Sequence, residues 1–219
     1  MELHAIDLGK TIVYLLGDRR GRVLIDAGSG ERTARLSNYL ARSHIEPGEI
    51  GLIVLTHSHA DHLGSLEGLL DLTGARVAIH PLERDRFLHE MRSMTGIAYD
   101  GPVLDPPWAH PLLVDDDFDL QRYGVKARVW HTPGHTEGSI SVIWEDRAAV
   151  GDTVMNLYPF NLGPVYPPFA EDPRGLLRSW RRMLDAGVML FYPGHGTPVS
   201  AERLEVVYGD RVEAQNRSE

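Results

Sequence analysis

THSHADHLGS, residues 56–65, follows the continuous apolar run IGLIVL of residues 50–55. A short run without polar residues is typical of a strand that is buried on both faces. The stretch after it places four potential metal ligands within six positions: His57, His59, Asp61 and His62. Imidazoles and carboxylates are the groups with which proteins bind Zn²⁺ and similar divalent ions. The pattern therefore predicts a metal site in the loop that leaves a buried strand.

The spacing of these ligands requires the backbone to turn after the strand. On an extended chain, residues two apart share a face, so His62 would point away from the other three ligands. Leucines then follow at helical spacing: Leu63, Leu66, Leu69 and Leu70. The sequence thus predicts a strand–loop–helix unit with the four ligands in its loop.

Three later stretches each carry a further candidate ligand just past a predicted strand. They are HTPGHTEGS with His135, AAVGDT with Asp152 and FYPGHGTP with His195. An earlier turn, VLIDAGSG, carries Asp26. Together with the HxHxDH pattern after an apolar strand, these stretches resemble the metallo-β-lactamase superfamily of metallohydrolases. The resemblance extends from Val23 to Pro198, over nearly the whole chain.

The resemblance implies an α/β fold, an αβ/βα four-layer sandwich in which two mixed sheets are flanked by helices. The length of 219 residues suits one well-buried domain, so we expect residues 1–219 to form a single domain of this kind. Periodicity and turn residues predict strands over 2–6, 11–16, 22–25, 50–55, 76–80, 125–130, 139–144, 148–150 and 188–192. They predict helices over 31–42, 81–91, 173–185 and from Ser200 onward.

The resemblance also implies the role of each ligand. One ion would take His57, His59 and His135, the other would take Asp61, His62 and His195, and Asp152 would bridge both. Asp61 would in addition orient a bridging hydroxide or pass on its proton, which makes Asp61 and Asp152 the expected catalytic residues. Asp26 is expected near the site without binding an ion, or as a carboxylate that fixes the turn backbone. The implied cofactors are two divalent ions, zinc first, with iron or manganese as alternatives.

Two motif positions narrow the range of activities within the superfamily. Di-iron flavoprotein relatives carry glutamate at the position of His59, so the histidine disfavours redox activity of that kind. True β-lactamases of this fold generally lack the bridging aspartate, so the presence of Asp152 makes antibiotic hydrolysis an unfavoured activity. The chain is similar to glyoxalase II and to acyl-homoserine lactonases, so we expect hydrolysis of a thioester, lactone or related carboxylic ester. Glyoxalase II carries a C-terminal helical extension that holds glutathione, whereas we expect one short helix after His195, which argues against a glutathione substrate.

Two other activities stay open. A persulfide dioxygenase of the same superfamily would use one Fe²⁺, held here by His57, His135 and Asp152. A phosphodiesterase or nuclease is the third alternative, although a net charge of −9 should repel a phosphate backbone. We therefore expect a small-molecule substrate and no nucleic-acid partner.

Residues 153–170 contain no charged side chain and are rich in aromatic residues and proline. A long apolar loop is usually functional or covered. It could wall a pocket for an apolar acyl group, form the interface of a homodimer, or pack on its own domain. In the first case Tyr158 or Tyr166 could donate a hydrogen bond to the substrate carbonyl.

Composition excludes several other classes. The chain has no cysteine, which removes disulfides, thiolate ligands and a cysteine nucleophile. No apolar run approaches the roughly 20 residues that a membrane span needs. The first residues, MELHAIDLGK, lack a basic head and an apolar core, so no secretory signal is expected and a cytoplasmic location is the default.

Overall fold

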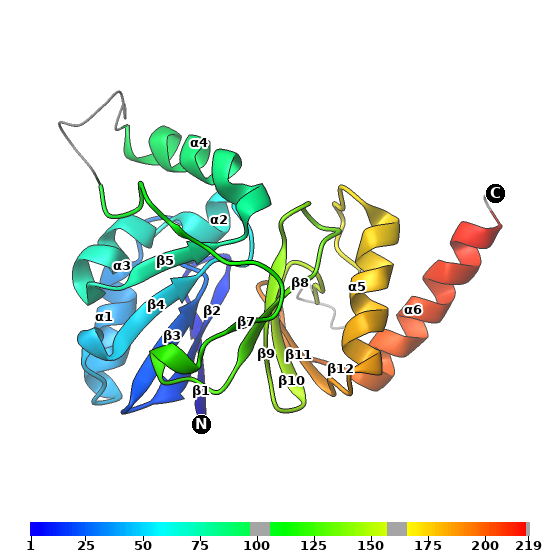
Figure 1. The fold of residues 1–219 in the computed structure, drawn as a ribbon, viewed down its shortest axis with the longest axis horizontal. Coiled ribbons are helices and arrows are strands. Elements are labelled where there is room, and N and C mark those ends of the chain that lie inside the picture. Colours follow the sequence, from blue (N-terminus) through cyan, green and yellow to red (C-terminus); the bar gives the residue numbers. More distant parts are fainter. Residues whose placement is uncertain (97–105, 157–165, 218–219) are drawn as a thin grey trace.

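Two mixed sheets of six strands lie between two layers of helices (Figure 1). The computed structural model describes residues 1–96, 106–156 and 166–217. This arrangement is the four-layer sandwich that the resemblance implies, with the order helix, sheet, sheet, helix.

The first sheet has the order β1-β2-β3-β4-β5-β6. Its first three strands pair antiparallel and the remaining ones pair parallel. The strands are β1 (Glu2–Asp7), β2 (Ile12–Asp18), β3 (Gly21–Ile25), β4 (Ile50–Val54), β5 (Arg76–Ile79) and β6 (Leu112–Leu113).

The second sheet has the order β12-β11-β10-β9-β8-β7. Only β10 and β11 pair parallel; the other neighbours are antiparallel. The strands are β7 (Phe118–Asp119), β8 (Arg128–His131), β9 (Ile140–Trp144), β10 (Arg147–Gly151), β11 (Leu190–Pro193) and β12 (Val199–Ser200).

Helices cover the outer face of each sheet. The outer face of the first sheet packs with α1 (Thr33–Arg42), α3 (Leu66–Thr73) and α4 (Arg84–Thr95), while α2 (Ala60–Leu63) is a single turn after β4. The second sheet packs with α5 (Pro173–Asp185) and α6 (Ala201–Asn216). None of the helices within the described residues is long and apolar enough to cross a membrane.

The strand β4 and its neighbours are buried on both faces, as the run IGLIVL predicts. Ile53 belongs to the core under the helices, whereas Leu52 and Val54 belong to the core between the sheets. Strand β2 alternates in the same way, with Val13 on one side and Tyr14 on the other. Burial on both sides fixes the register of these strands, and so fixes where the loops at their ends begin.

Several predicted boundaries shift. The helix predicted from residue 31 begins at Thr33, and the helix predicted from Pro81 is a 3₁₀ turn, Pro81–Glu83, followed by α4. The strand predicted over 125–130 is β8, Arg128–His131, because the chain is still turning at Val125, whose N–H bonds the Leu120 carbonyl at 3.4 Å. The last long strand is β11 rather than residues 188–192, and the short strands β6, β7 and β12 were not predicted.

Candidate metal centre

The loops that carry the predicted ligands meet at one end of the two sheets (Figure 1). The loop after β4 supplies His57 and His59, and α2 supplies Asp61 and His62. The parallel strands β10 and β11 end at the same edge, which brings Asp152 and His195 together, with His195 Nε2 3.6 Å from Asp152 Oδ1. The connection between β8 and β9 adds His135. The structure thus brings together all seven predicted ligands.

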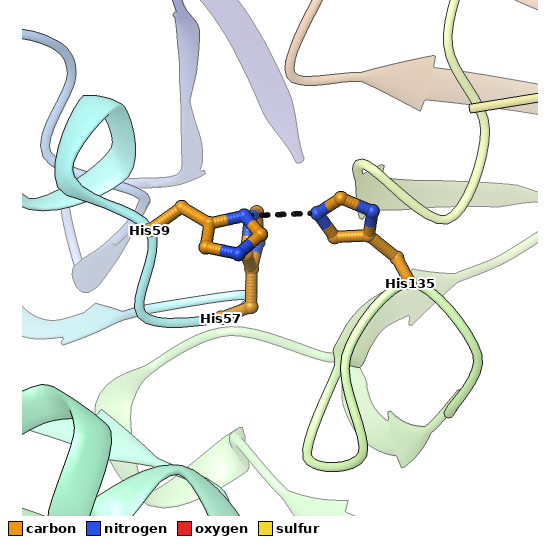
Figure 2. Close-up of side chains that lie close together, drawn as sticks. All are labelled: His57, His59 and His135. Carbon is orange, nitrogen blue, oxygen red and sulfur yellow. Dashed lines mark hydrogen bonds between the residues drawn. The ribbon is translucent and has the colours of Figure 1, made fainter. Parts of the chain in front are cut away.

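Three of the imidazoles form one group, shown in Figure 2. His59 Nδ1 lies 3.0 Å from His57 Nε2 and 3.0 Å from His135 Nε2. His57 and His135 are buried, whereas His59 is half-buried and forms the accessible side of the group. A second group consists of Asp61, His62 and His195, in which His195 Nε2 lies 3.1 Å from Asp61 Oδ2.

Asp152 lies between the two groups and turns one oxygen toward each. Its Oδ1 is 3.2 Å from His62 Nε2, in the second group. Its Oδ2 is 3.6 Å from His135 Nε2 and 4.0 Å from His57 Nε2, in the first group. A carboxylate in this position can share its two oxygens between two cations.

The outer ring nitrogens of four histidines each donate to an oxygen. His62 Nδ1 donates to Asp26 (2.8 Å), His135 Nδ1 to the Phe169 carbonyl (2.8 Å) and His195 Nδ1 to the Lys10 carbonyl (2.9 Å). The Thr56 hydroxyl donates to Asp26 and can therefore accept from His57 Nδ1 at 3.1 Å. A neutral imidazole that donates through one nitrogen has a lone pair on the other, so each inner Nε2 is a ligand atom.

This donor set fits a divalent cation. His62 Nε2 and Asp152 Oδ1 are buried and have no hydrogen-bond partner among the described residues. His59 Nδ1 can donate to at most one of its two neighbours at 3.0 Å, His57 Nε2 or His135 Nε2, whereas a cation between the three nitrogens would satisfy them together. The cluster therefore supports binding of divalent metal ions.

Electrostatics keep His57 neutral and Asp152 ionised. Burial, and then the neighbouring imidazoles, hold the pKa of His57 well below its usual range. Burial alone would raise the pKa of Asp152, but His62 and the other histidines lower it. Burial would also lower the pKa of His62, yet the carboxylates of Asp26 and Asp152 raise it well above its usual range. A proton and a metal ion therefore compete for His62 Nε2.

Asp26 contacts a ligand of the cluster and also fixes the backbone of the ligand loop. It thereby combines the two roles that the sequence left open, a position near the site and a carboxylate that fixes a turn. It follows β3 with a φ of 64°, a left-handed conformation that aspartate tolerates better than most residues. Its carboxylate accepts the Thr56 N–H at 2.8 Å and the His62 Nδ1–H at 2.8 Å. It thus fixes the start of the ligand loop and the orientation of one ligand at the same time.

Glu83 is a supporting residue that sequence reasoning missed. Its buried carboxylate accepts the Ser58 N–H at 3.0 Å and the Gly138 N–H at 3.2 Å. These two loops carry His57 and His135, so one side chain ties together the ligand loops of the two sheets. Its partners are 25 and 55 residues away, and no local pattern indicates such contacts.

The two tyrosines predicted to contact substrate stay predictions. Tyr158 lies outside the described residues, as do all of residues 157–165 of the uncharged loop 153–170. The Tyr166 ring packs edge-on against Trp180 at 5.8 Å and lies under the Arg211 guanidinium at 4.3 Å. These contacts attach Tyr166 to α5 and α6. His131, which precedes the turn that carries His135, stacks on His80 with ring centroids 4.0 Å apart.

A cavity of about 640 Å³ opens between α1, the α2–α3 segment and α4. Its walls include Leu63, Met91 and Met94 beside the carboxylates of Glu31 and Glu67. None of the seven clustered ligands is among the described residues that line it. This cavity is therefore separate from the cluster.

The sequence is similar to those of known proteins over most of its length. Residues 6–195 match the family model of the Metallo-beta-lactamase superfamily. A beta-lactamase-like protein 2 homolog from Caenorhabditis elegans is 30% identical over 90% of this chain and 59% of its own length. A hydroxyacylglutathione hydrolase from Shewanella pealeana is 29% identical over 69% of this chain and 47% of its own length. The chain thus spans only about half to three fifths of these two relatives.

The fold has a counterpart among solved structures. The crystal structure of a metallo-beta-lactamase family protein from Thermus thermophilus aligns with a TM-score of 0.72 and 25% identity, covering 97% of this chain and 79% of that one.

Proposed function

The chain belongs to the metallo-beta-lactamase superfamily, and on that premise we propose that it hydrolyses a thioester, lactone or related carboxylic ester with two bound divalent ions. The observation that carries the proposal is the arrangement of the inner ring nitrogens and of Asp152. Two groups of ligand atoms face one another across a carboxylate that offers one oxygen to each group.

In this proposal His57, His59 and His135 hold one ion and Asp61, His62 and His195 hold the other, with Asp152 between them. Zinc suits these nitrogen and oxygen ligands, and iron or manganese could take its place. Two such ions, when bound, lower the pKa of a shared water toward neutrality and polarise a carbonyl oxygen.

Asp61 is the carboxylate placed to move protons. Its side chain is 35% exposed, against 7% for Asp152, so it alone of the two can exchange a proton readily with solvent. The His195 hydrogen bond is the main cause that holds the pKa of Asp61 below its usual range, which keeps the carboxylate ionised. Asp61 would orient the attacking water and take up its proton.

The residues beside His135 favour a substrate with an apolar acyl group. The Phe169 carbonyl accepts from His135, while the Phe169 ring is 77% exposed. Residues 153–170 carry no charge, and exposed apolar surface of this kind usually contacts a ligand or another chain. The same loop is our proposed contact if the protein forms a homodimer.

The test is metal analysis combined with turnover. We expect two metal ions per chain, hydrolysis of S-phenyl thioesters or of lactones that ceases after chelation, and recovery with added zinc. The Asp61→Asn variant should lose at least about 100-fold in kcat, because general-base catalysis contributes on that order.

The competing assignment predicts a different result. A single iron per chain and oxygen uptake with glutathione persulfide would replace the hydrolase by a dioxygenase that uses His57, His135 and Asp152. Metal-loaded protein that turns over none of these thioesters and lactones would also contradict the proposal.

A further inference from the structure

One ion pair crosses between the two helical layers beside the cluster. Arg86, on α4, donates from Nη2 to Glu171 Oε1 at 2.5 Å, although the two residues are 85 positions apart. Glu171 is attached to the loop of His135 at two further points. Its N–H bonds the His135 carbonyl at 3.2 Å, and its Oε2 accepts the Glu137 N–H at 3.0 Å. The pair therefore stands directly beside one of the ligand loops.

The pair is connected to the three-histidine group through His135. His59 is the accessible member of that group, and its Nδ1 lies 3.0 Å from His135 Nε2. Because Glu171 bonds the backbone of both His135 and Glu137, Arg86 stands beside the loop that carries one of the ligands.

Arg86 has hydrogen-bonding capacity that Glu171 does not use. A guanidinium carries five N–H donors and binds a carboxylate best through two parallel hydrogen bonds. Here a single short contact joins Nη2 to Glu171, and the buried Nη1 has no hydrogen-bond partner among the described residues. The side chain as a whole is 37% exposed, so a ligand can reach part of the guanidinium.

A cation at this place matters in an acidic protein. The net charge of −9 repels an anionic substrate at long range, so recognition of such a substrate requires a positive group close to the reacting carbonyl. Arg84, two residues earlier on α4, is 52% exposed and pairs with Asp85 at 3.7 Å. Among the described residues, this pair does not connect Arg84 to the loops that carry the ligands.

We propose that Arg86 binds a carboxylate carried by the substrate, and that the Glu171 carboxylate occupies this place when no substrate is bound. The proposal rests on the hydrolase function and deepens it, because it names the substrate class as an ester or thioester whose apolar acyl chain ends in a carboxylate. Exchange of one carboxylate for another leaves Arg86 paired throughout. Glu171 remains held to the Glu137 N–H when it gives up Arg86.

The experiment compares two substrates that differ in one charge. They are the mono-S-phenyl thioester of adipic acid and the S-phenyl thioester of adipamic acid, its monoamide, and the quantity measured is the ratio of their kcat/KM values. Arg86→Gln should lower the anionic-to-neutral ratio by about 10-fold or more, as expected for loss of a hydrogen bond between charged groups. Arg86→Lys should lower it less, because the charge remains while the bidentate geometry is lost.

The Glu171→Gln variant distinguishes recognition of the substrate carboxylate by Arg86 from a purely structural role of the Arg86–Glu171 pair. Glutamine can still accept the Glu137 N–H but no longer competes for Arg86, so this variant should raise the anionic-to-neutral ratio through a lower KM for the anionic thioester. The matched control, Arg84→Gln, should leave the ratio as in the wild type. If Arg86→Gln and Glu171→Gln reduce turnover of both thioesters alike, the pair only holds α4 to the His135 loop, and the proposal is wrong.

A binding measurement makes the result independent of turnover. Calorimetry on metal-loaded protein should show adipate binding more tightly than adipamide, with most of that difference lost in Arg86→Gln. If neither thioester is hydrolysed but this difference is found, the proposed function fails while the anion site stands. Equal loss of adipate affinity in Arg84→Gln, or no loss in Arg86→Gln, would overturn the anion site itself.

Discussion

Asp26 shows how a residue that holds no ion can determine how well the cluster binds one. Its carboxylate accepts from His62 Nδ1 and from the Thr56 N–H, and both contacts are buried. The negative charge makes His62 Nε2 a better electron-pair donor, and the fixed geometry aims that nitrogen at Asp152, 3.2 Å away. Asp26 therefore acts on the metal site through His62.

The first prediction concerns Asp26→Asn. Asparagine tolerates the left-handed backbone at this position, so the fold should be retained. The neutral amide is a weaker acceptor for His62, and we expect metal affinity to fall by about 10- to 100-fold. Competition with a chromogenic chelator measures this change. Asp7→Asn, at an exposed carboxylate paired with Arg35, is the matched control, and equal affinity in both variants would contradict the role assigned to Asp26.

At the scale of elements, the turn after β11 presents His195 by fitting tightly against the segment after β10. The Asn156 N–H bonds the His195 carbonyl at 3.0 Å, and the Asn156 side chain bonds the Thr197 hydroxyl at 2.7 Å. Gly196 has a φ of 95°, and a Cβ added there would lie 1.5 Å from the Asn156 carbonyl oxygen. Only glycine allows the two segments to approach this closely.

The second prediction compares Gly196→Ala with Gly187→Ala. Both glycines have positive φ, but a Cβ at Gly187 meets nothing within 4 Å. Gly187→Ala should cost about 1–2 kcal/mol of unfolding free energy through backbone strain alone and leave metal binding intact. Gly196→Ala should cost more and also weaken metal binding, because the turn that carries His195 must move. Denaturant unfolding and metal titration measure the two effects, and identical behaviour of the variants would refute the steric argument.

Elements whose pattern is local could be predicted from the sequence. The run IGLIVL predicted β4, because a strand buried on both faces fixes its own ends. The histidines and aspartates in the loops after the strands were predicted as ligands; the structure brings them together, and their binding of metal stays a prediction. The start of β8 was predicted three residues early because Val125 and Ala127 are buried beside the sheet without belonging to it.

The supporting contacts could not be predicted in the same way. Glu83, Glu171 and Arg86 look like ordinary charged residues of turns and helices, and their roles depend on partners 25 to 85 residues away. Three consecutive aspartates, Asp115 to Asp117, are exposed, yet Asp116 also pairs with Arg182 of α5 at 3.0 Å. Only the tertiary fold specifies such contacts.

At the scale of the whole molecule, the ligands come from both sheets. The first sheet and its connections supply His57, His59, Asp61 and His62, and the second supplies His135, Asp152 and His195. Each of the two ligand groups contains at least one residue from each side. Bound ions would therefore hold the two sheets together in addition to the apolar core between them.

The third prediction follows from that placement. Unfolding separates the ligands, so ions that bind the folded chain stabilise it by mass action, by about 4 kcal/mol per ion at a free metal concentration of 1,000 times Kd. For a chain of this length each kcal/mol shifts Tm by about 2–4 °C, so chelation should lower Tm by about 8–16 °C for each ion removed. Differential scanning calorimetry before and after chelation measures the shift. In His195→Ala, which keeps only the three-histidine group intact, chelation should lower Tm by a smaller amount. A Tm that chelation leaves unchanged in the wild type would mean that the ions do not join the two sheets, because ligands drawn from both sides cannot hold an ion without resisting their separation.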